Sequence, residues 1–406
     1  MKDKIILLFM FFCALTSFPS PARETVNVFL DSHVAIDVDY IKTKIPFVNY
    51  VNDKDNADVH LLISARITSS NGVEYSMKFI GYNEHEGLEY NIIYCSNPLD
   101  SEAIVREALV EELKKGLFPF LLEYEIISGL NIEYREKIER PKKDPWNFWV
   151  FNISINGYIS GTESTGYSNF WTAAAVSRTT EKNKFRAAFS YSKSENHYNL
   201  DQLNNYKTVS RFRDFNSYYV YSLSDHWSIG GNWGLFTSTY SNIKLEGFVV
   251  PAIEYNIFPY SESSFRELSF KYRIFFKHSK YFEETIYDKK TDDFTGQGIE
   301  VFYSVKQTWG GIYLFLSAKH YFENFDFNNV SLSPAINIKI FKGLSLSIDG
   351  NFTMVHDQYF ISKKDVTEED ILLQRKELKT QYNYRLGLGF NYTFGSIYRN
   401  VVNTRF

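Results

Sequence analysis

The sequence predicts an α+β protein in which a small α/β domain precedes an antiparallel transmembrane β-barrel of about twelve strands. Aromatic residues make up 18% of the 406 residues at a mean hydropathy of −0.29, which excludes a disordered chain. Beyond residue 20, no apolar run approaches the roughly 20 residues that a helix needs to cross a membrane. The formal net charge of −4 gives no bulk reason to bind nucleic acid.

The first 22 residues have the three-part layout of a secretory signal peptide. Charged residues (MKDK) precede an apolar stretch over 5–18, and the small residues Ser20 and Ala22 stand where a peptidase would cut. A transmembrane anchor is the less favoured interpretation, because the apolar stretch is short for a bilayer core of about 30 Å. Cleavage removes Cys13 and leaves Cys95 as the sole cysteine, so the exported protein has no internal disulfide.

Charge and tryptophan divide the mature chain near residue 145. Residues 23–144 carry 14 basic and 22 acidic side chains and no Trp, whereas residues 146–406 carry 28 basic, 25 acidic and all 6 Trp. The segment 134–145 (YREKIERPKKDP) is dense in charge and contains two prolines, which is typical of a solvated linker. We therefore expect a domain over 23–133, a linker over 134–145 and a barrel over 146–406.

The first domain alternates strand and helix signals. We expect a short strand over 26–31, a helix from its N-cap Asp39 through Tyr50, and a second helix that begins at Ser101. Three further strands are expected over 57–68, 73–82 and 88–95. This order predicts a small α/β sandwich, a common form for a periplasmic module.

The second domain shows the two-residue period of strands with two environments. In 382–394, for example, Tyr, Leu and Phe occupy every even position and Asn, Arg, Gly and Thr the odd ones. Such runs are about 9 to 15 residues long, whereas soluble strands average roughly 5 or 6 and a tilted membrane strand needs about 9 to 11. The expected strands are 147–160, 166–179, 184–194, 207–223, 226–239, 243–258, 264–279, 297–308, 311–322, 330–341, 343–357 and 378–394.

Loop lengths and strand ends fit a bacterial outer-membrane barrel. Connections after even-numbered strands are short, whereas those over 195–206, 280–296, 323–329 and 358–377 are long. Aromatic residues cluster at strand ends, as expected for girdles at two membrane interfaces. An even strand count places both termini on the short-turn side, and hence the first domain in the periplasm.

Three segments, together with the α/β module, resemble a family of Gram-negative outer-membrane β-barrel proteins with an N-terminal periplasmic α/β domain. They are DPWNFWVF (144–151), PAIEYNIFPY (251–260) and YTFGSIYRNVVNTRF (392–406). The terminal Phe406 resembles the signal that the barrel-assembly machinery reads, although the alternation stops at Phe394. The resemblance implies location and fold, with outer-membrane lipid and the assembly machinery as partners, but no substrate.

No catalytic or metal-binding pattern stands out. His278 and Ser279 are adjacent and so point to opposite faces of their strand, which does not suit a hydrolase. Asp31, His33, Asp37 and Asp39 are close enough to share an ion, but Asp31 fits a turn residue and Asp39 a helix N-cap better. We expect no enzyme activity, no metal and no cofactor.

Charges that face the lumen are the best functional indication. On each strand, the residues that alternate with the apolar face are expected to point into the lumen. Nine of these residues are basic: Arg186, Arg211, Arg213, Lys271, Arg273, Lys306, Lys319, Lys339 and Arg385. Three acidic groups face them: Glu254, Glu300 and Asp349. The lumen must either hold water or pair these charges, so an open pore that favours anions and a plugged barrel both stay possible.

These patterns leave three functions open. The first is a channel or solute-binding barrel whose periplasmic domain binds a partner protein; the second is a plugged barrel that anchors a periplasmic partner; the least favoured is a membrane-embedded hydrolase. The acidic segment 367–378 (TEEDILLQRKEL) fits a short helix in the last outer loop, where it could cap the barrel. The solute, the partner and the oligomeric state are not indicated.

Overall fold

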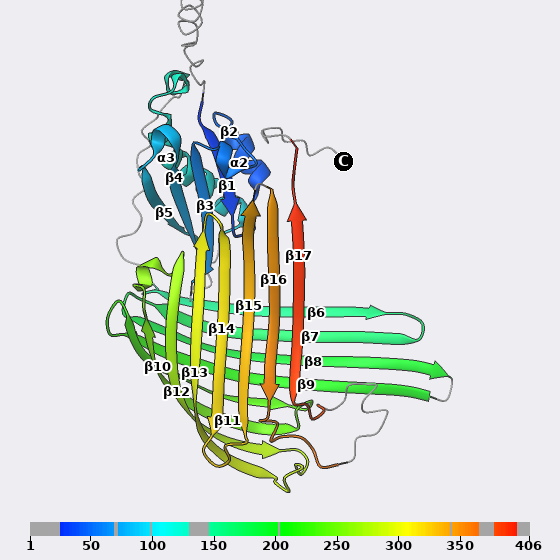
Figure 1. Ribbon diagram of the computed structural model, residues 1–406. Helices are drawn as coiled ribbons and strands as arrows, with labels where there is room; N and C mark the ends of the chain where they lie inside the picture. Colours follow the sequence, from blue (N-terminus) through cyan, green and yellow to red (C-terminus); the bar gives the residue numbers. More distant parts are fainter. Residues whose placement is uncertain are drawn as a thin grey trace, which may run out of the picture.

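The computed structural model contains two separate β-sheets, one of five strands and one of twelve (Figure 1). It describes residues 25–68, 72–97, 100–129, 146–201, 204–341, 343–364 and 377–395. The expected signal peptide, the linker over 134–145 and Phe406 lie outside the described residues.

The smaller sheet has the strand order β2-β1-β3-β4-β5, in which β1 is parallel to β2 and β3 and the other pairs are antiparallel. Its strands are β1 (Asn27–Ser32), β2 (Asn49–Tyr50), β3 (Val59–Ile67), β4 (Val73–Gly81) and β5 (Glu89–Cys95). The helices are α2 (Val38–Lys44) and α3 (Glu102–Leu121), with short 3-10 turns η1 (Lys54–Asn56), η2 (Asn83–His85) and η3 (Glu125–Gly129). This confirms a small α/β unit ahead of the larger sheet.

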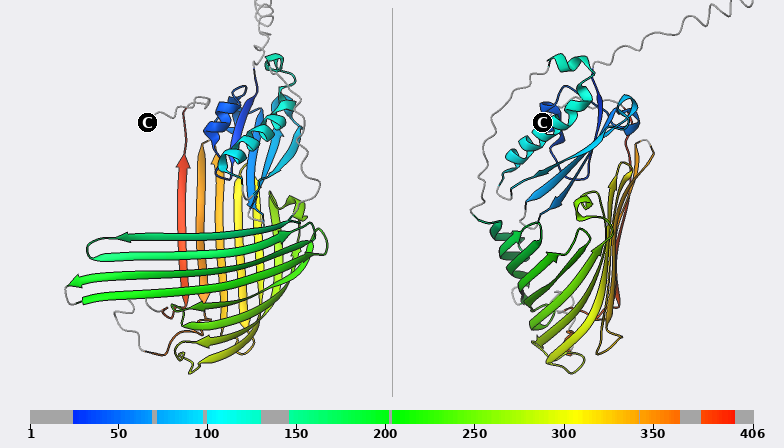
Figure 2. Two further views of the ribbon diagram at one scale, coloured as in Figure 1. Left: turned by 180° about the vertical axis from the view of Figure 1, so that it is seen from behind. Right: turned by 90° about the vertical axis from the view of Figure 1, so that its left-hand side faces the viewer.

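The core of the α/β unit lies between the sheet and both helices (Figure 2). Val28, Leu61 and Phe79 from the strands are buried against Leu113 and Phe120 of α3. Gly116 of α3 lies over the Phe79 ring, and a Cβ there would collide with it. The absence of a side chain at this position lets helix and sheet approach closely.

The first helix differs from its prediction at both ends. Its N-cap is Asp37, whose carboxylate accepts a hydrogen bond from the Tyr40 N–H at 2.9 Å, whereas Asp39 lies inside the first turn. A capping side chain must precede the first helical residue, so Asp39 cannot serve. The helix ends at Lys44 instead of Tyr50, because Asn49 and Tyr50 pair with β1 as β2.

The larger sheet confirms the prediction of twelve antiparallel strands, each paired with its neighbours in sequence. The short 3-10 helix η4 (Tyr260–Glu262) lies between β11 and β12. The strands are β6 (Trp149–Gly161), β7 (Thr165–Thr179), β8 (Asn183–Asp201), β9 (Asn204–Ser222), β10 (Trp227–Ser238), β11 (Ile243–Asn256), β12 (Arg266–Tyr281), β13 (Thr291–Gln307), β14 (Gly310–Tyr321), β15 (Asn328–Phe341), β16 (Leu344–Val355) and β17 (Tyr382–Tyr392).

One predicted long loop is strand instead. Residues expected to connect β8 and β9 over 195–206 pair across the hairpin nearly to its tip, so both strands reach 19 residues. Glu195 supports this extension by ion pairs with Lys193 and, across the hairpin at 3.1 Å, with Lys207. The polar residues that suggested a loop instead form the tip of a projecting hairpin.

The twelve-stranded sheet curves but does not close, which differs from the predicted barrel. β6 and β17 form its two edges and do not pair with each other in the described residues. β6 to β9 run across the direction of β14 to β17, so the two edges diverge (Figures 1 and 2). The α/β unit lies beside the short-turn end of the sheet.

Candidate functional site: the inner face of the twelve-stranded sheet

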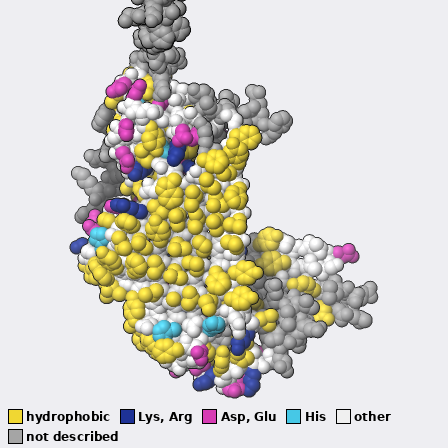
Figure 3. Space-filling model, in the orientation of Figure 1, with side chains coloured by type: hydrophobic (Ala, Val, Ile, Leu, Met, Phe, Trp, Pro, Cys, Tyr) yellow, Lys and Arg dark blue, Asp and Glu magenta, His cyan; other side chains and the backbone are white. Residues whose placement is uncertain are grey.

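The two faces of the large sheet carry different side chains. We call its convex side the outer face, defined by Phe215, Trp233, Val249 and Phe276, and its concave side the inner face. On the outer face, Ile153 is 78% exposed and Phe390 is 74% exposed. Hydrophobic side chains form a continuous band across β12 to β16, with charges gathered beyond its ends (Figure 3).

The register places most of the predicted lumen-facing charges on the inner face. Arg273, for example, pairs with Gly298, which pairs with Lys319, so these positions share one face. The inner-face members of the predicted set are Arg186, Lys271, Arg273, Lys306, Lys319, Lys339, Arg385, Glu254, Glu300 and Asp349.

Arg211 and Arg213 are the exceptions. Both lie at an even spacing from Phe215, which pairs with Leu235 on the outer face. The register of β9 with β8 and β10 is continuous here, so all three residues point to the same face. Their prediction as lumen-facing is therefore wrong. Aromatic residues occupy both faces of β9, including Phe212 and Phe215, so parity alone could not identify its apolar side.

Several inner-face charges were missed by the sequence analysis. The register of paired strands identifies them as Lys184, Lys277, Asp214, Glu246, Glu267 and Asp292. Four of these six are acidic, so the basic excess on the inner face is smaller than predicted. Strict alternation contained this signal for five of them, because each lies at an even spacing from an assigned inner-face neighbour on its strand. Asp214 is the exception, because the faces of β9 were assigned the wrong way round.

A polar cavity of about 610 Å³ lies on the inner face near the short turns. Lys271 and Arg273 both contact Glu300 at 2.7 Å, so one carboxylate lies between two cations. Tyr260 of η4 donates a hydrogen bond to Glu254 at 3.2 Å, and Lys184 also lines the cavity. The cavity offers donors and both signs of charge, which suits a small polar solute.

At the opposite end of the inner face, Tyr359 is buried against an acidic group. Its hydroxyl donates to Glu246 at 2.7 Å, and Ser279 donates to the same carboxylate at 2.7 Å. Lys277 contacts Glu246 at 3.2 Å, so the buried charge is paired. Phe294 and Tyr321 pack around the Tyr359 ring.

Residues 356–364, which follow β16, thereby cover the inner face at its loop end. Asp357 pairs with Lys319 at 2.6 Å, and the Phe360 carbonyl accepts a hydrogen bond from Asn242 at 3.0 Å. A bridge between Thr285 and Ser362 fixes the far end of this segment. Most of the predicted cap over 367–378 lies outside the described residues, so the described cover comes from the segment before it.

The α/β unit covers the inner face at the short-turn end. Lys339 of β15 pairs with Asp31 of β1, and the Lys306 ammonium donates to the Ala65 carbonyl at 3.4 Å. Ser264 donates a hydrogen bond to Glu74 of β4 at 2.9 Å. The two sheets therefore meet through polar contacts that join residues up to 308 positions apart in sequence.

Asp31 lies at the centre of this contact. His60 is fully buried and its Nε2 lies 3.1 Å from the Asp31 carboxylate. Burial lowers the pKa of His60 below its ordinary value, and the Asp31 hydrogen bond opposes this only in part. Burial raises the pKa of Asp31, but contacts with His60 and Lys339 outweigh it and lower that pKa overall.

The acidic residues of the hypothetical ion site over 31–39 have separate roles in the fold. Asp31 pairs with Lys339 and Asp37 caps α2. Across the part of the chain that the structure describes, no three or more His, Cys, Asp or Glu side chains cluster as a metal site.

His278 and Ser279 lie on opposite faces, as their adjacency predicts. His278 contacts Asp293 at 2.6 Å on the outer face, whereas Ser279 is buried on the inner face beside Glu246. The hydroxyl and the imidazole therefore have separate partners. This pair does not form the contact that a serine nucleophile and its general base require.

No helix among the described residues is long and apolar enough to cross a membrane. No protein-family model and no curated protein matches the sequence. Among solved structures, a NanC porin aligns over 60% of this chain and 99% of its own, at 8% identity and a TM-score of 0.29. The translocator domain of the autotransporter NalP from Neisseria meningitidis aligns over 61% and 87%, at 8% identity and a TM-score of 0.27.

The β domain of the Bordetella autotransporter Brka aligns over 61% of this chain and 98% of its own, at 10% identity and a TM-score of 0.25. Identities and TM-scores this low assign no family and no activity. The chain's own geometry defines its class: a long-stranded antiparallel sheet with an apolar outer face and a charged inner face that is covered at both ends.

Proposed function

We propose that this protein is an outer-membrane β-barrel of a Gram-negative bacterium, with a solute-binding interior and an α/β domain in the periplasm. The segregation of side chains between the two faces of the large sheet carries the proposal. Soluble monomers rarely expose apolar patches beyond a few hundred Å², whereas here nearly every long strand presents large apolar side chains outward. A lipid bilayer removes the free-energy cost of exposing these apolar side chains to water.

The membrane also requires the sheet to close. Unpaired N–H and C=O groups of an edge strand cost several kcal/mol each in hydrocarbon, so membrane sheets are closed barrels. β6 and β17 are the first and last strands of the large sheet, and each has one edge that no described strand pairs with. We propose that these edges pair in the membrane, as an assembly machinery that recognises Phe406 would promote.

Cell fractionation tests the membrane assignment. The full chain should appear in the outer-membrane fraction and migrate differently on a gel with and without heating, because dense inter-strand hydrogen bonds keep an unheated barrel compact. A protein recovered in the soluble fraction would reject the proposal.

The polar cavity favours a channel or solute-binding barrel, with a lumen that both covers close at rest. Tyr359→Ala with Asp357→Asn should release residues 356–364 and raise single-channel conductance in planar bilayers. The matched control Tyr287→Ala removes a tyrosine from the neighbouring loop without touching Glu246. Equal conductance in all three proteins would contradict gating by this segment.

The ion-pair network favours a second candidate, a plugged barrel that anchors a periplasmic partner protein. Glu300, Glu246 and Asp357 each neutralise an inner-face cation, as in a permanently filled lumen. Absence of conductance in every variant, together with a specific protein captured by residues 23–144, would favour the anchor over the channel.

A further inference from the structure

The charged side chains that line the polar cavity near the short turns fall into two groups. Lys271, Arg273 and Glu300 form one group, because both cations contact the Glu300 carboxylate at 2.7 Å. Lys184 and Glu254 also line the cavity, but neither forms an ion pair among the described residues. The cavity therefore presents one ammonium and one carboxylate that no described counter-charge contacts.

Two tyrosines position these two charges instead. The Lys184 ammonium lies 5.7 Å from the centre of the Tyr218 ring. The Tyr260 hydroxyl donates a hydrogen bond to the Glu254 carboxylate at 3.2 Å. A ring face and a neutral hydroxyl stabilise a charge without neutralising it. Each group can therefore still bind a ligand group of opposite charge.

Small side chains form the floor of the cavity between the two charges. The register places one row across β8 to β11: Lys184, Val220, Gly230 and Ala252. Glu254 lies two residues beyond Ala252 and so points to the same face. Because β9 and β10 lie between them, three strand spacings of about 4.8 Å separate the strands of Lys184 and Glu254. The low floor leaves room for a solute between the ammonium and the carboxylate.

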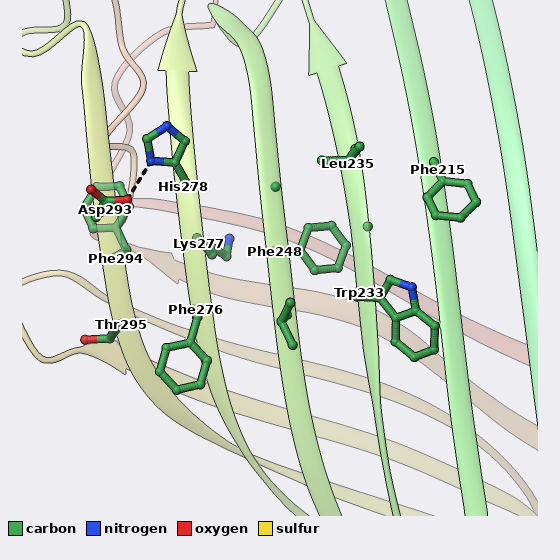
Figure 4. A pocket seen from close by; sticks show the side chains of 13 residues that line it. Phe215, Trp233, Leu235, Phe248, Phe276, Lys277, His278, Asp293, Phe294 and Thr295 are labelled. Carbon is green, nitrogen blue, oxygen red and sulfur yellow. Dashed lines mark hydrogen bonds and ion pairs between the residues drawn. The ribbon is translucent and has the colours of Figure 1, made fainter.

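A recess of about 630 Å³ on the outer face provides a contrast (Figure 4). Its lining is mainly apolar, and the charged residues among those that line it have partners. His278 contacts Asp293 at 2.6 Å, and Lys277 contacts Glu246 at 3.2 Å. The geometry of this recess does not indicate a charged ligand, whereas that of the polar cavity does.

We propose that the polar cavity binds one small zwitterion, an amino acid, with its carboxylate on Lys184 and its ammonium on Glu254. The inference rests on the proposed solute-binding barrel and names the class of its solute. A ligand that desolvates a charged group without pairing it loses binding free energy. A plain anion would do this to Glu254 and an uncharged solute to both groups, whereas a zwitterion pairs each one. The volume of about 610 Å³ suits a ligand of this size.

Calorimetric titration of the full-length protein in detergent micelles tests the site with three probes of similar shape. Leucine carries both charges. The hydroxy acid 2-hydroxy-4-methylpentanoate has a hydroxyl in place of the ammonium, and leucinamide has an amide in place of the carboxylate. Leucine should bind about tenfold more tightly than either analogue, because only leucine pairs both protein charges.

Two variants separate the two contacts. Lys184→Gln should weaken leucine binding about tenfold and leave leucinamide binding unchanged, because leucinamide has no carboxylate. Glu254→Gln should weaken leucine binding to a similar extent without weakening the hydroxy acid, and a glutamine there can still accept the Tyr260 hydrogen bond. The controls Glu181→Gln and Lys182→Gln make the same substitutions in the turn before β8, outside the cavity, and should leave all three affinities unchanged.

Tighter binding of the hydroxy acid than of leucine would identify an anion site and overturn the inference. Equal binding of the three probes, or no binding, would overturn it as well. Gel migration of the same sample with and without heating tests the proposed barrel separately. A heat-modifiable protein that binds none of the probes would reject the zwitterion site and leave the membrane barrel standing, whereas a protein that is soluble without detergent would reject the barrel itself.

Discussion

The two sheets of this protein share the same alternation of apolar and polar residues, but their apolar faces lie in opposite environments. In the five-stranded sheet, apolar residues such as Val28, Leu61 and Phe79 point into a core closed by α3 and have almost no exposed surface. In the twelve-stranded sheet, Ile153 and Phe390 point away from the protein and are mostly exposed. A period of two residues therefore defines two faces of a strand, but not which face is covered.

Strand length and context supply what the alternation lacks. The strands of the small sheet have 2 to 9 residues and lie among helices, whereas those of the large sheet have 11 to 19 residues and no described helix packs on their outer face. A helix that packs on a sheet buries its apolar face in protein. Among the described residues no such layer covers the apolar face of the large sheet, and the proposed membrane embedding would cover it with lipid.

The largest expected difference between the two regions is their behaviour in water. Residues 23–144, expressed alone, should be soluble and give the circular dichroism of a mixed α/β fold, because their core is internal. Residues 146–406 should aggregate unless detergent is present. A random-coil spectrum of the first fragment, or a detergent-free soluble second fragment, would contradict the comparison.

A substitution in the closed core should have the next largest effect. Phe79→Ala removes a fully buried ring that packs over Gly116, and should lower the free energy of unfolding of fragment 23–144 by about 3 to 5 kcal/mol. Urea denaturation measures this. Ile67→Ala is the matched control, since that side chain is exposed, and it should change the unfolding free energy by less than about 0.5 kcal/mol.

A charge introduced on the outer face should destabilise the protein slightly less than the loss of the Phe79 ring. Ile299→Arg places a guanidinium at the middle of β13, and should destabilise the membrane-inserted protein by about 2 to 4 kcal/mol. The control Ser317→Arg adds the same group to the inner face beside Glu300. Insertion into lipid vesicles should fall only for the first variant, and equal insertion would contradict the assignment of faces.

The contact between the two sheets should contribute less again. Lys339→Met removes the large-sheet partner of Asp31, leaving His60 in place, and should weaken docking of the α/β unit by about 1.5 to 3 kcal/mol. Protease cleavage between the two units, compared with wild type, measures the docking. Lys290→Met, a substitution of an exposed lysine in the loop after β12, should leave the cleavage rate unchanged.

Acid should also loosen the α/β unit, by a smaller amount. The pKa of His60 is lowered in the folded state, so unfolding takes up a proton below about pH 6.5, and stability falls as pH falls through that value. The lowered pKa of Asp31 adds stability that is lost only at lower pH. Thermal melts from pH 7.5 to 5.5 should show a decrease that His60→Gln reduces.

The smallest effect concerns ion selectivity. The sequence count of nine basic to three acidic lumen groups predicts anion preference, but Asp214, Glu246, Glu267 and Asp292 also share the inner face. We therefore expect a weak anion preference if the lumen conducts. Reversal potentials in a salt gradient measure this preference. A cation preference would contradict the inference that the inner-face charges make the lumen positive.

Strand number and direction were predictable because alternation is a local signal that each strand repeats. The same signal failed in β9, where Phe212 and Phe215 lie on opposite faces and Arg211 was misassigned. Closure was predicted from strand lengths, aromatic strand ends and alternating loop lengths, none of which determines how the two edge strands meet. The pairing of Lys339 with Asp31 joins residues 308 positions apart, so no local pattern could indicate it.

The edges of the large sheet also determine how it can fold. Within the sheet, each strand pairs with its neighbours in sequence, so hairpins can form one after another with little loss of chain entropy. A seam between β6 and β17, as proposed for the membrane, would be different, because it would close a loop of roughly 240 residues at an entropic cost of about 5 kcal/mol. Sealing that seam would then be the slow step of folding, which a catalyst in the membrane would have to assist.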